Sequence, residues 1–170
     1  KLLEKKEHSL SDKEEKILAQ TGEMATAASD IYQMFLNADA SFGTIQNEEG
    51  EEAEVTNGNY ISFMQSHNRE VRKAAFHAVY HTLEAYKNTL GAMFQANVKQ
   101  EKFYAQVRSY PSSMEMQLME NSIPVSVYEN LIAAVHEALP AMYKYVGLRK
   151  KVLGVEELHM YDVYASMTKD

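Results

Sequence analysis

The side chains best placed to bind a metal are two histidines four residues apart, His77 and His81, followed by Glu84. Residues three and four apart lie on one face of a helix, so this spacing would present two imidazoles and a carboxylate together, as a zinc or nickel site requires. The stretch lacks the glutamate that follows the first histidine in the H-E-x-x-H pattern of metalloproteases. Because the stripe continues with polar residues, we interpret it as the solvated polar face of a helix.

Two further patterns begin like metal motifs and do not complete them. His136 and Glu137 open an H-E-x-x-H pattern, but Pro140 stands where the second ligand should be, and proline offers zinc no donor. Glu156 and His159 match the E-x-x-H motif of di-iron bundles, which needs a second such motif and two more glutamates. Neither a P-loop nor a G-x-S-x-G or G-x-G-x-x-G motif occurs. The sequence therefore indicates no catalytic, cofactor-binding or metal-ligating residue within 1–170.

Composition excludes several other kinds of chemistry. The 170 residues hold 17 Lys and Arg against 24 Asp and Glu, a formal charge of −7, which argues against a general nucleic-acid binder. There is no cysteine, so disulfides, thiolate nucleophiles and Cys-ligated zinc are excluded, and a reducing compartment is compatible. No apolar run approaches the roughly 20 residues of a membrane span. We therefore expect a protein that binds neither nucleic acid nor membranes.

The elements around these residues are expected to be helices, because only three prolines and seven glycines interrupt good helix formers. A capping box of Ser11 and Glu14 opens a helix predicted over 12–37. The stretch 68–108 predicts one long central helix. Its small stripe is Val71, Ala75, Ala78, Thr82, Ala85, Thr89, Ala92 and Ala96, and its bulky stripe is Phe76, Val79, Leu83, Tyr86, Leu90 and Met93. Such a helix would contact neighbours on two sides, with the small stripe buried against a partner helix.

The remaining segments complete the predicted fold. Alternation of apolar and polar residues around a glutamate-rich turn predicts a β-hairpin over 42–56, whose acidic tip we interpret as solvated rather than as a recognition site. Residues 114–120 predict a short helix, and 127–153 predict a long one that Pro140 should kink and that ends at Gly154. The expected fold class is mainly α, a multi-helix bundle with a long central helix and one small β-hairpin.

The C-terminal end carries apolar and aromatic side chains that nothing later in the chain covers, namely Leu158, Met160, Tyr161 and Tyr164. Large exposed apolar patches usually indicate a missing partner. The chain also starts at Lys1 rather than at an initiator Met. We therefore expect a piece of a longer protein, whose bare end either self-associates or stays disordered when it is isolated.

Several segments, in order along nearly the whole chain, resemble the helical part of the oligoendopeptidase F family. The matching segments are His8-Ser9-Leu10-Ser11 with 14–19, Ser66 with 69–76, Tyr110-Pro111-Ser112-Ser113, Ile123-Pro124 with 127–132, 148–154, and 158–164. Each is weak alone, but their common order makes the resemblance fairly specific.

The resemblance implies a zinc metalloendopeptidase that cleaves short oligopeptides inside a closed helical shell. In that family, zinc is held by the two histidines of H-E-x-x-H and a later glutamate, which lie beyond this stretch, so no catalytic or metal residue is carried over. Residues 1–170 are then a single helical lobe that precedes the catalytic zinc domain, contacts that domain and walls the substrate channel. The resemblance implies that the chain alone is inactive and that its parent is cytoplasmic. The alternative is a self-standing helical interaction domain without a catalytic role.

Overall fold

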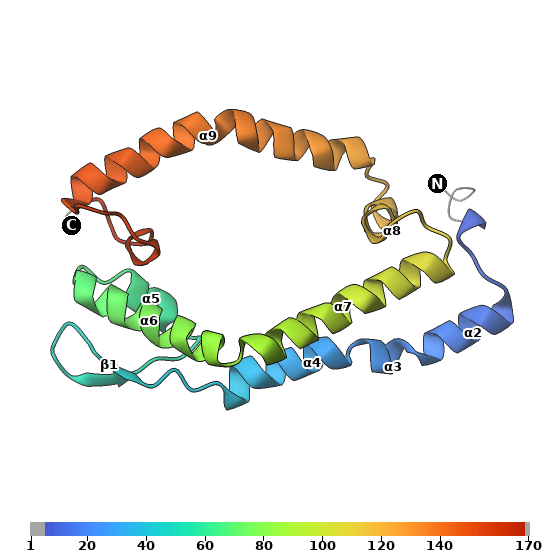
Figure 1. Ribbon diagram of the computed structural model, residues 1–170, viewed down its shortest axis with the longest axis horizontal. Coiled ribbons are helices and arrows are strands. Elements are labelled where there is room, and N and C mark those ends of the chain that lie inside the picture. The colour runs from blue at the N-terminus through green and yellow to red at the C-terminus, as the bar shows by residue number, and fades with distance from the viewer. Residues whose placement is uncertain (1–5, 169–170) are drawn as a thin grey trace. The chain divides into compact units, whose positions relative to one another are not determined.

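The computed structural model describes residues 6–168, which form a mainly α structure with one small antiparallel sheet (Figure 1). This confirms the predicted fold class in its main terms. In chain order the elements are α2 (Asp12–Gln20), α3 (Gly22–Ala25), α4 (Ala27–Met34), the π-helix η1 (Phe35–Asp39), β1 (Thr44–Gln46), β2 (Glu52–Glu54), α5 (Tyr60–Met64), α6 (Arg69–Ala85), α7 (Lys87–Val107), α8 (Ser113–Glu120), α9 (Val125–Leu153) and the 3-10 helix η2 (Met160–Asp162).

Contacts divide the chain into two compact units, each built from two separate stretches. The first unit contains the chain up to Gln33 together with Thr89–Glu137, and the second contains Met34–Asn88 together with the chain from Ala138 onward. The hydrophobic core lies in the second unit. In the first unit, the buried apolar residues among those described are Leu18 and Ala105. The first unit thus has very little core of its own.

The core of the second unit lies between the hairpin and α6. Its buried members are Phe42, Ile45, Val55, Val71, Ala75 and Val79. The hairpin predicted over 42–56 is confirmed: β1 pairs antiparallel with β2, and Ile45 faces Ala53 in the register. Alternation along β1 places Ile45 toward the core, while its neighbours Thr44 and Gln46 stay exposed. Period-2 patterning in the sequence therefore fixes which strand face packs on the helix.

The acidic hairpin tip is exposed, as expected, but one of its glutamates is bound. Glu48 accepts hydrogen bonds from the Ser66 hydroxyl and from the backbone N–H groups of His67, at 2.8 Å, and Asn68. These bonds, that of Ser66 first, lower the pKa of Glu48. Asn68 also caps α6 by accepting from the Glu70 N–H at 3.0 Å. A carboxylate at the first turn of α6 suits the positive end of the helix dipole.

The helix predicted over 12–37 is wrong as a single element. The capping box at its start is present, since the Ser11 N–H donates to the Glu14 carboxylate at 2.9 Å. The helix then breaks at Thr21 and Thr26, giving α2, α3 and α4. The Thr21 hydroxyl donates to the Leu18 carbonyl at 2.7 Å, and such side-chain bonds to nearby carbonyls compete with the helix ladder.

The single long central helix is also wrong, because the chain forms α6 and α7 with a break at Tyr86. The longest helix is instead α9, with 29 residues. Along the predicted small stripe, Val71 and Ala75 are buried, whereas the members from Ala85 onward are exposed. The stripe therefore packs only over the first part of α6.

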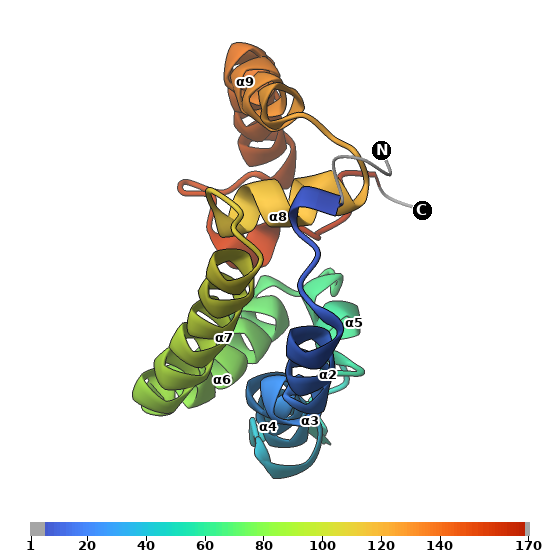
Figure 2. The same cartoon turned by 90° about the vertical axis from the view of Figure 1, so that its right-hand side faces the viewer.

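A turn and a short helix follow α7 in the first unit. The predicted helix over 114–120 is confirmed as α8, and Ser112 caps it by accepting from the Glu115 N–H at 3.1 Å. Figure 2 shows α8 lying across the direction of α7. Two serines at the ends of these helices, Ser109 and Ser122, have φ of 56° and 58°. Left-handed backbone suits glycine, so both serines hold strained conformations.

The last long helix runs unbroken through Pro140, and Gly154 ends it with φ of 65°. Left-handed backbone at this position is the usual helix terminator and favours glycine. Lys150 and Lys151 occupy the last turn, as expected for cations near the negative end of a helix dipole. Within the part of the chain that the structure describes, no helix is both long and apolar enough to cross a membrane.

Candidate functional site

A buried carboxylate, Asp162, lies at the centre of the most extensive polar network in the second unit. Its side chain is fully buried, and its two oxygens accept from Arg69 Nε at 3.1 Å, Arg69 Nη2 at 2.9 Å and Arg72 Nη2 at 2.9 Å. The backbone N–H of His159 donates to it as well, at 3.0 Å. Burial alone would raise the pKa of Asp162, but these hydrogen bonds outweigh burial and hold the pKa well below its usual range.

Arg72 links this carboxylate to two further backbone segments. Only 3% of the residue is exposed, so its charge is removed from water. Nε donates to the Tyr161 carbonyl at 3.0 Å, and Nη1 donates to the carbonyls of Ser66 at 2.8 Å and His67 at 3.2 Å. Arg72 therefore joins the loop before α6 to η2, with Asp162 as its counter-ion.

Arg149 holds the same segment from α9. It is buried, and its Nη2 donates to the carbonyls of Asp162 at 2.7 Å and Ala165 at 2.6 Å. Nη1 contacts the Tyr145 hydroxyl at 3.2 Å, while the buried Nε has no hydrogen-bond partner among the described residues. The Arg149 guanidinium therefore donates its hydrogen bonds to backbone carbonyl oxygens rather than to a carboxylate.

Aromatic contacts complete the attachment of η2 to α6. Tyr161 is buried and stacks on the His159 ring, with centroids 4.9 Å apart and planes 13° from parallel. The Arg69 guanidinium lies 5.2 Å from the centre of the Tyr161 ring, and Phe76 meets that ring edge-on at 6.0 Å. Aromatic stacking and cation–π contact therefore add to the ionic network.

This arrangement anchors the chain rather than performing chemistry. Both oxygens of Asp162 are occupied by donors, and its low pKa keeps it ionised, so it is unsuited to proton transfer near neutral pH. The three arginines instead bind the backbone of 157–165 through several carbonyls. We call Arg69, Arg72, Arg149 and Asp162 the arginine clamp.

The first unit has a comparable attachment at its N-terminal end. Arg108 forms a two-pronged ion pair with Glu15, with both N–O distances at 2.8 Å. His8 Nδ1 donates to the Arg108 carbonyl at 2.8 Å, and the His8 ring stacks 3.6 Å from that of Tyr110. The hydrogen bond from Arg108 is the main cause of a lowered pKa at Glu15. These contacts fix the segment before α2 to the end of α7.

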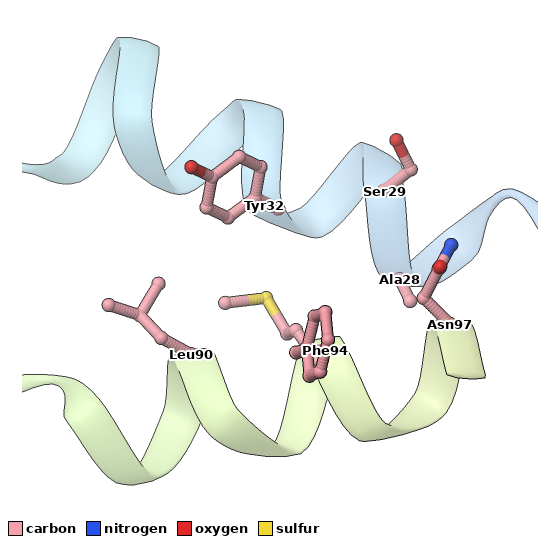
Figure 3. Close-up of a pocket in the computed structure, with 7 residues that line it drawn as sticks. Ala28, Ser29, Tyr32, Leu90, Phe94 and Asn97 are labelled. Carbon is pink, nitrogen blue, oxygen red and sulfur yellow. The ribbon is translucent and has the colours of Figure 1, made fainter. Parts of the chain in front are cut away.

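An apolar groove lies between α4 and α7 in the first unit (Figure 3). Its cavity measures about 290 Å³ and is lined by Ala28, Ser29, Tyr32, Leu90, Met93, Phe94 and Asn97. Tyr32 lies on α4, and Phe94 projects from α7 toward it. No charged side chain lines the groove, which makes it suited to an uncharged, apolar group.

The residues with metal-like spacing do not come together as a site. His77, His81 and Glu84 are exposed on α6, as a solvated polar face requires. His136 is exposed on α9, and His159 lies 3.8 Å from the exposed Glu157. Among residues 6–168, no three His, Asp or Glu side chains cluster closely enough to hold a metal ion.

The expectation of a wholly uncovered C-terminal end is wrong in part. Tyr161 and Ala165 are buried, because α6 and the arginine clamp cover them. Met160 and Tyr164 remain exposed, at 64% and 50%. The aromatic run therefore has one covered side and one open side.

The arginine clamp belongs to none of the metal-binding or catalytic motifs that the sequence contains in part. Asp162 lies 93 residues after Arg69 and 90 residues after Arg72, so no local motif joins it to them. One signal was available: Arg72 lies directly beside Val71 and three residues before Ala75 on the buried side of α6. A charge on a buried helix face needs a counter-charge, which here is Asp162.

Two family models match the chain in succession. The model described as Oligopeptidase F matches residues 1–42, and the model described as Peptidase family M3 matches residues 62–170. The second match contains the whole arginine clamp and covers more than half of the chain.

Curated relatives and a solved structure agree with these models. Oligopeptidase PepF of Bacillus subtilis is 45% identical over 163 residues, which are 96% of this chain and 24% of that protein. An oligoendopeptidase F homolog of Lactococcus lactis is 44% identical over 168 residues, 99% of this chain and 28% of that protein. The crystal structure of oligoendopeptidase-F from Enterococcus faecium matches with a TM-score of 0.94 and 39% identity, over 97% of this chain and 32% of that one.

The chain thus spans about a quarter of the length of the curated relatives. Its elements follow those of a solved oligoendopeptidase closely, and more than half of its residues match one peptidase family model. The chain belongs to peptidase family M3.

Proposed function

We propose that this chain is a non-catalytic helical segment of an oligoendopeptidase F-like zinc metallopeptidase that cleaves short oligopeptides. One observation carries the proposal: 99% of the chain aligns at 44% identity with an oligoendopeptidase F homolog, yet covers only 28% of it. The described residues do not fit a zinc site, since no three suitable ligands cluster. Zinc ligands and the catalytic base are therefore expected in the rest of the parent protein, and no catalytic step is assigned to this chain.

We further propose that the segment precedes the catalytic part, contacts it and contributes to the wall of the substrate channel. Two features of the first unit support this proposal, namely the groove between α4 and α7 and the exposed apolar side chains. Both are surfaces that the catalytic part or a peptide substrate could contact. A channel with a closed wall selects substrates by size, because a folded protein cannot enter.

The absence of cysteine is compatible with a cytoplasmic parent, which cell fractionation tests.

The proposed function is tested on the full-length protein that contains this chain. We expect it to hydrolyse a short quenched-fluorescent peptide and to lose that activity when a zinc chelator is added. Activity should return when zinc is added back. Absence of peptidase activity in folded, zinc-loaded protein would contradict the assignment.

The channel role has its own measurement. Peptides of increasing length with one shared cleavage sequence should show a steep fall in kcat/KM once they exceed the channel, and folded proteins should resist cleavage. The control is the folded substrate protein after denaturation and cutting into short peptides, because its amino-acid sequence is unchanged. Equal cleavage of short peptides and folded proteins would contradict the proposed size-selecting wall, although the proposed peptidase function would still hold.

A further inference from the structure

A small cavity lies beside the arginine clamp in the second unit. It measures about 250 Å³, and its wall includes Arg69, Arg72 and His67 together with the hydroxyl-bearing Ser166 and Thr168. All of its lining residues belong to the second unit, so contacts within one unit position them. Among the described residues, no Asp or Glu lines this cavity. Its wall therefore carries positive charge without an acidic side chain.

The arginine clamp holds more positive than negative charge. Its three guanidiniums meet a single carboxylate, that of Asp162, which pairs with Arg69 and Arg72. Arg149 donates to backbone carbonyls, which carry no net charge. Three positive charges and one negative charge leave the clamp with a net formal charge of +2. Because Arg72 is buried, part of this charge lies where the surroundings screen it less than water does.

Other carboxylates approach the same segments but are exposed. Glu48 binds the loop before α6, Glu70 lies in the first turn of α6, and Glu157 precedes η2. Water and salt screen exposed charges, so these three glutamates neutralise the buried arginines only weakly. The last turn of α9 also borders the cavity, and helix carbonyls there disfavour an anion, but Lys150 and Lys151 occupy the same turn and offset them.

Hydrogen-bond donors around the cavity outnumber the acceptors that the described residues offer. Arg69 lines the cavity, 35% of its side chain is exposed, and no hydrogen bond within the described chain uses its Nη1. Arg149 binds the carbonyl of Ala165, a wall residue, and its buried Nε has no hydrogen-bond partner among the described residues. Since buried donors are normally satisfied, this surplus favours an occupant rich in acceptor oxygens.

We propose that this cavity binds a small oxyanion, namely a carboxylate or phosphate group, with Arg69 and Arg72 as its cationic wall. Such groups are rich in acceptor oxygens and match the guanidinium, which is more weakly hydrated than an ammonium. A volume of about 250 Å³ suits a few heavy atoms rather than a whole peptide. Two sources offer this chemistry, a free phosphate ion and the terminal carboxylate of an oligopeptide, and only the second rests on the proposed function.

Isothermal titration calorimetry of the full-length protein that contains this chain tests the site. The probes are inorganic phosphate, a tripeptide with a free terminal carboxylate, and the same tripeptide with a terminal amide as the uncharged control. We expect phosphate or the free-carboxylate tripeptide to bind with a Kd of about 1 mM or tighter. Binding of phosphate identifies a free ion as the source, and binding of the acid but not the amide tripeptide identifies a peptide terminus.

Two substitutions of one wall residue show where the anion binds. Val152 lines the cavity and is 50% exposed, so both Glu and Gln have room at this position. Val152→Glu adds a carboxylate at the cavity and should weaken anion binding at least about ten-fold, whereas the uncharged Val152→Gln should change it by less than about two-fold. Arg69→Gln should also weaken binding at least about ten-fold, because it removes a charged donor. Circular dichroism identifies any variant that fails to fold, and the Val152 pair then decides the result.

Absence of binding by both phosphate and the free-carboxylate tripeptide would overturn the proposal. Binding that is equally strong in Val152→Glu would also overturn it, because the anion would then lie elsewhere in the parent protein, such as at a metal centre. An amide tripeptide that binds as tightly as the acid form shows recognition without the oxyanion, and phosphate alone then decides. Peptidase activity of the unsubstituted protein is measured separately, so a failed anion site and a failed function are distinguishable.

Discussion

Asp162 shows how a single buried charge can organise a segment that has no regular hydrogen-bonded ladder. It is fully buried and bound by two arginines, and its neighbouring carbonyls are bound by Arg72 and Arg149. Taking charges out of water is costly, so such a network tolerates the loss of a partner poorly. Residue-scale predictions therefore centre on this carboxylate.

Replacing Asp162 by Asn should destabilise the chain strongly. Arg69 and Arg72 would then lose their shared counter-charge, and breaking a buried ion pair in this way costs about 3–5 kcal/mol. Urea denaturation followed by circular dichroism measures the free energy of unfolding. Glu137→Gln, which removes an exposed carboxylate on α9, is the control and should change it by less than about 0.5 kcal/mol. Equal effects of the two substitutions would show that the clamp contributes no stability.

The contribution of Asp162 should also depend on pH in a defined direction. Its pKa is lowered in the folded state, so an unfolded carboxyl with a pKa of about 3.9 binds a proton before the folded one does. The stabilisation is therefore complete well above pH 4 and declines as the pH falls below it. The difference in unfolding free energy between the native chain and the Asp162→Asn variant, measured from pH 7 to pH 3, should shrink toward acid. A difference that is constant over this range would contradict the ionised-carboxylate account.

The candidate residues show what sequence spacing predicts and what it does not. His77 and His81 share a helix face, as their spacing predicts, because both lie in one regular element. The clamp joins α6, α9 and η2, and only folding brings these together. Long-range ionic contacts of this kind leave no periodic signal in the sequence.

At the scale of elements, periodicity predicted where helices and strands occur but not where they break. The hairpin, α8 and the end of α9 at Gly154 agree with local signals of turn and cap residues. The breaks at Thr26 and Tyr86 are not predicted, because the apolar pattern continues across both. Helix breaks of this kind depend on hydroxyl bonding and packing, which periodicity does not encode.

The small stripe on α6 and α7 gives a paired prediction. Ala75 is fully buried, so Ala75→Leu should overpack the core and cost about 1–3 kcal/mol. Ala85 is exposed, so Ala85→Leu should change the unfolding free energy by less than about 0.5 kcal/mol. Urea denaturation of both variants provides the comparison, and the two substitutions control for each other because the side chains are the same. A large penalty at Ala85 alone would reverse this assignment.

The ends of α7 and α8 offer a stabilising substitution. Ser109 and Ser122 hold positive φ, and left-handed backbone costs a non-glycine residue about 1–2 kcal/mol. Ser109→Gly and Ser122→Gly should each raise the unfolding free energy by about 0.5–1 kcal/mol, since glycine gives back part of the gain as chain entropy. Thermal denaturation measures the change. Ser126→Gly, inside α9, is the control and should lower stability instead.

At the scale of the whole molecule, the chain is expected to be inactive by itself. Its described residues form no cluster of three metal ligands, so purified material should not cleave a quenched oligopeptide, with or without added zinc. Full-length parent protein, assayed beside it, is the positive control. Cleavage that a chelator abolishes would contradict this prediction. A variant that keeps the fold but cannot bind zinc would then show which residues carry the activity.

The division into two interleaved units has a consequence for synthesis on the ribosome. The first unit needs Thr89–Glu137 to join the chain up to Gln33, and the second needs the chain from Ala138 onward to join Met34–Asn88. Ribosomes add about 5–20 residues per second, so the opening helices wait several seconds for their partners. During that interval Leu18, which is buried in the folded structure, stays open to solvent. Neither half of the sequence can therefore fold and leave the tunnel as a finished domain, and translation speed between residues 34 and 137 sets how long the newborn chain stays vulnerable.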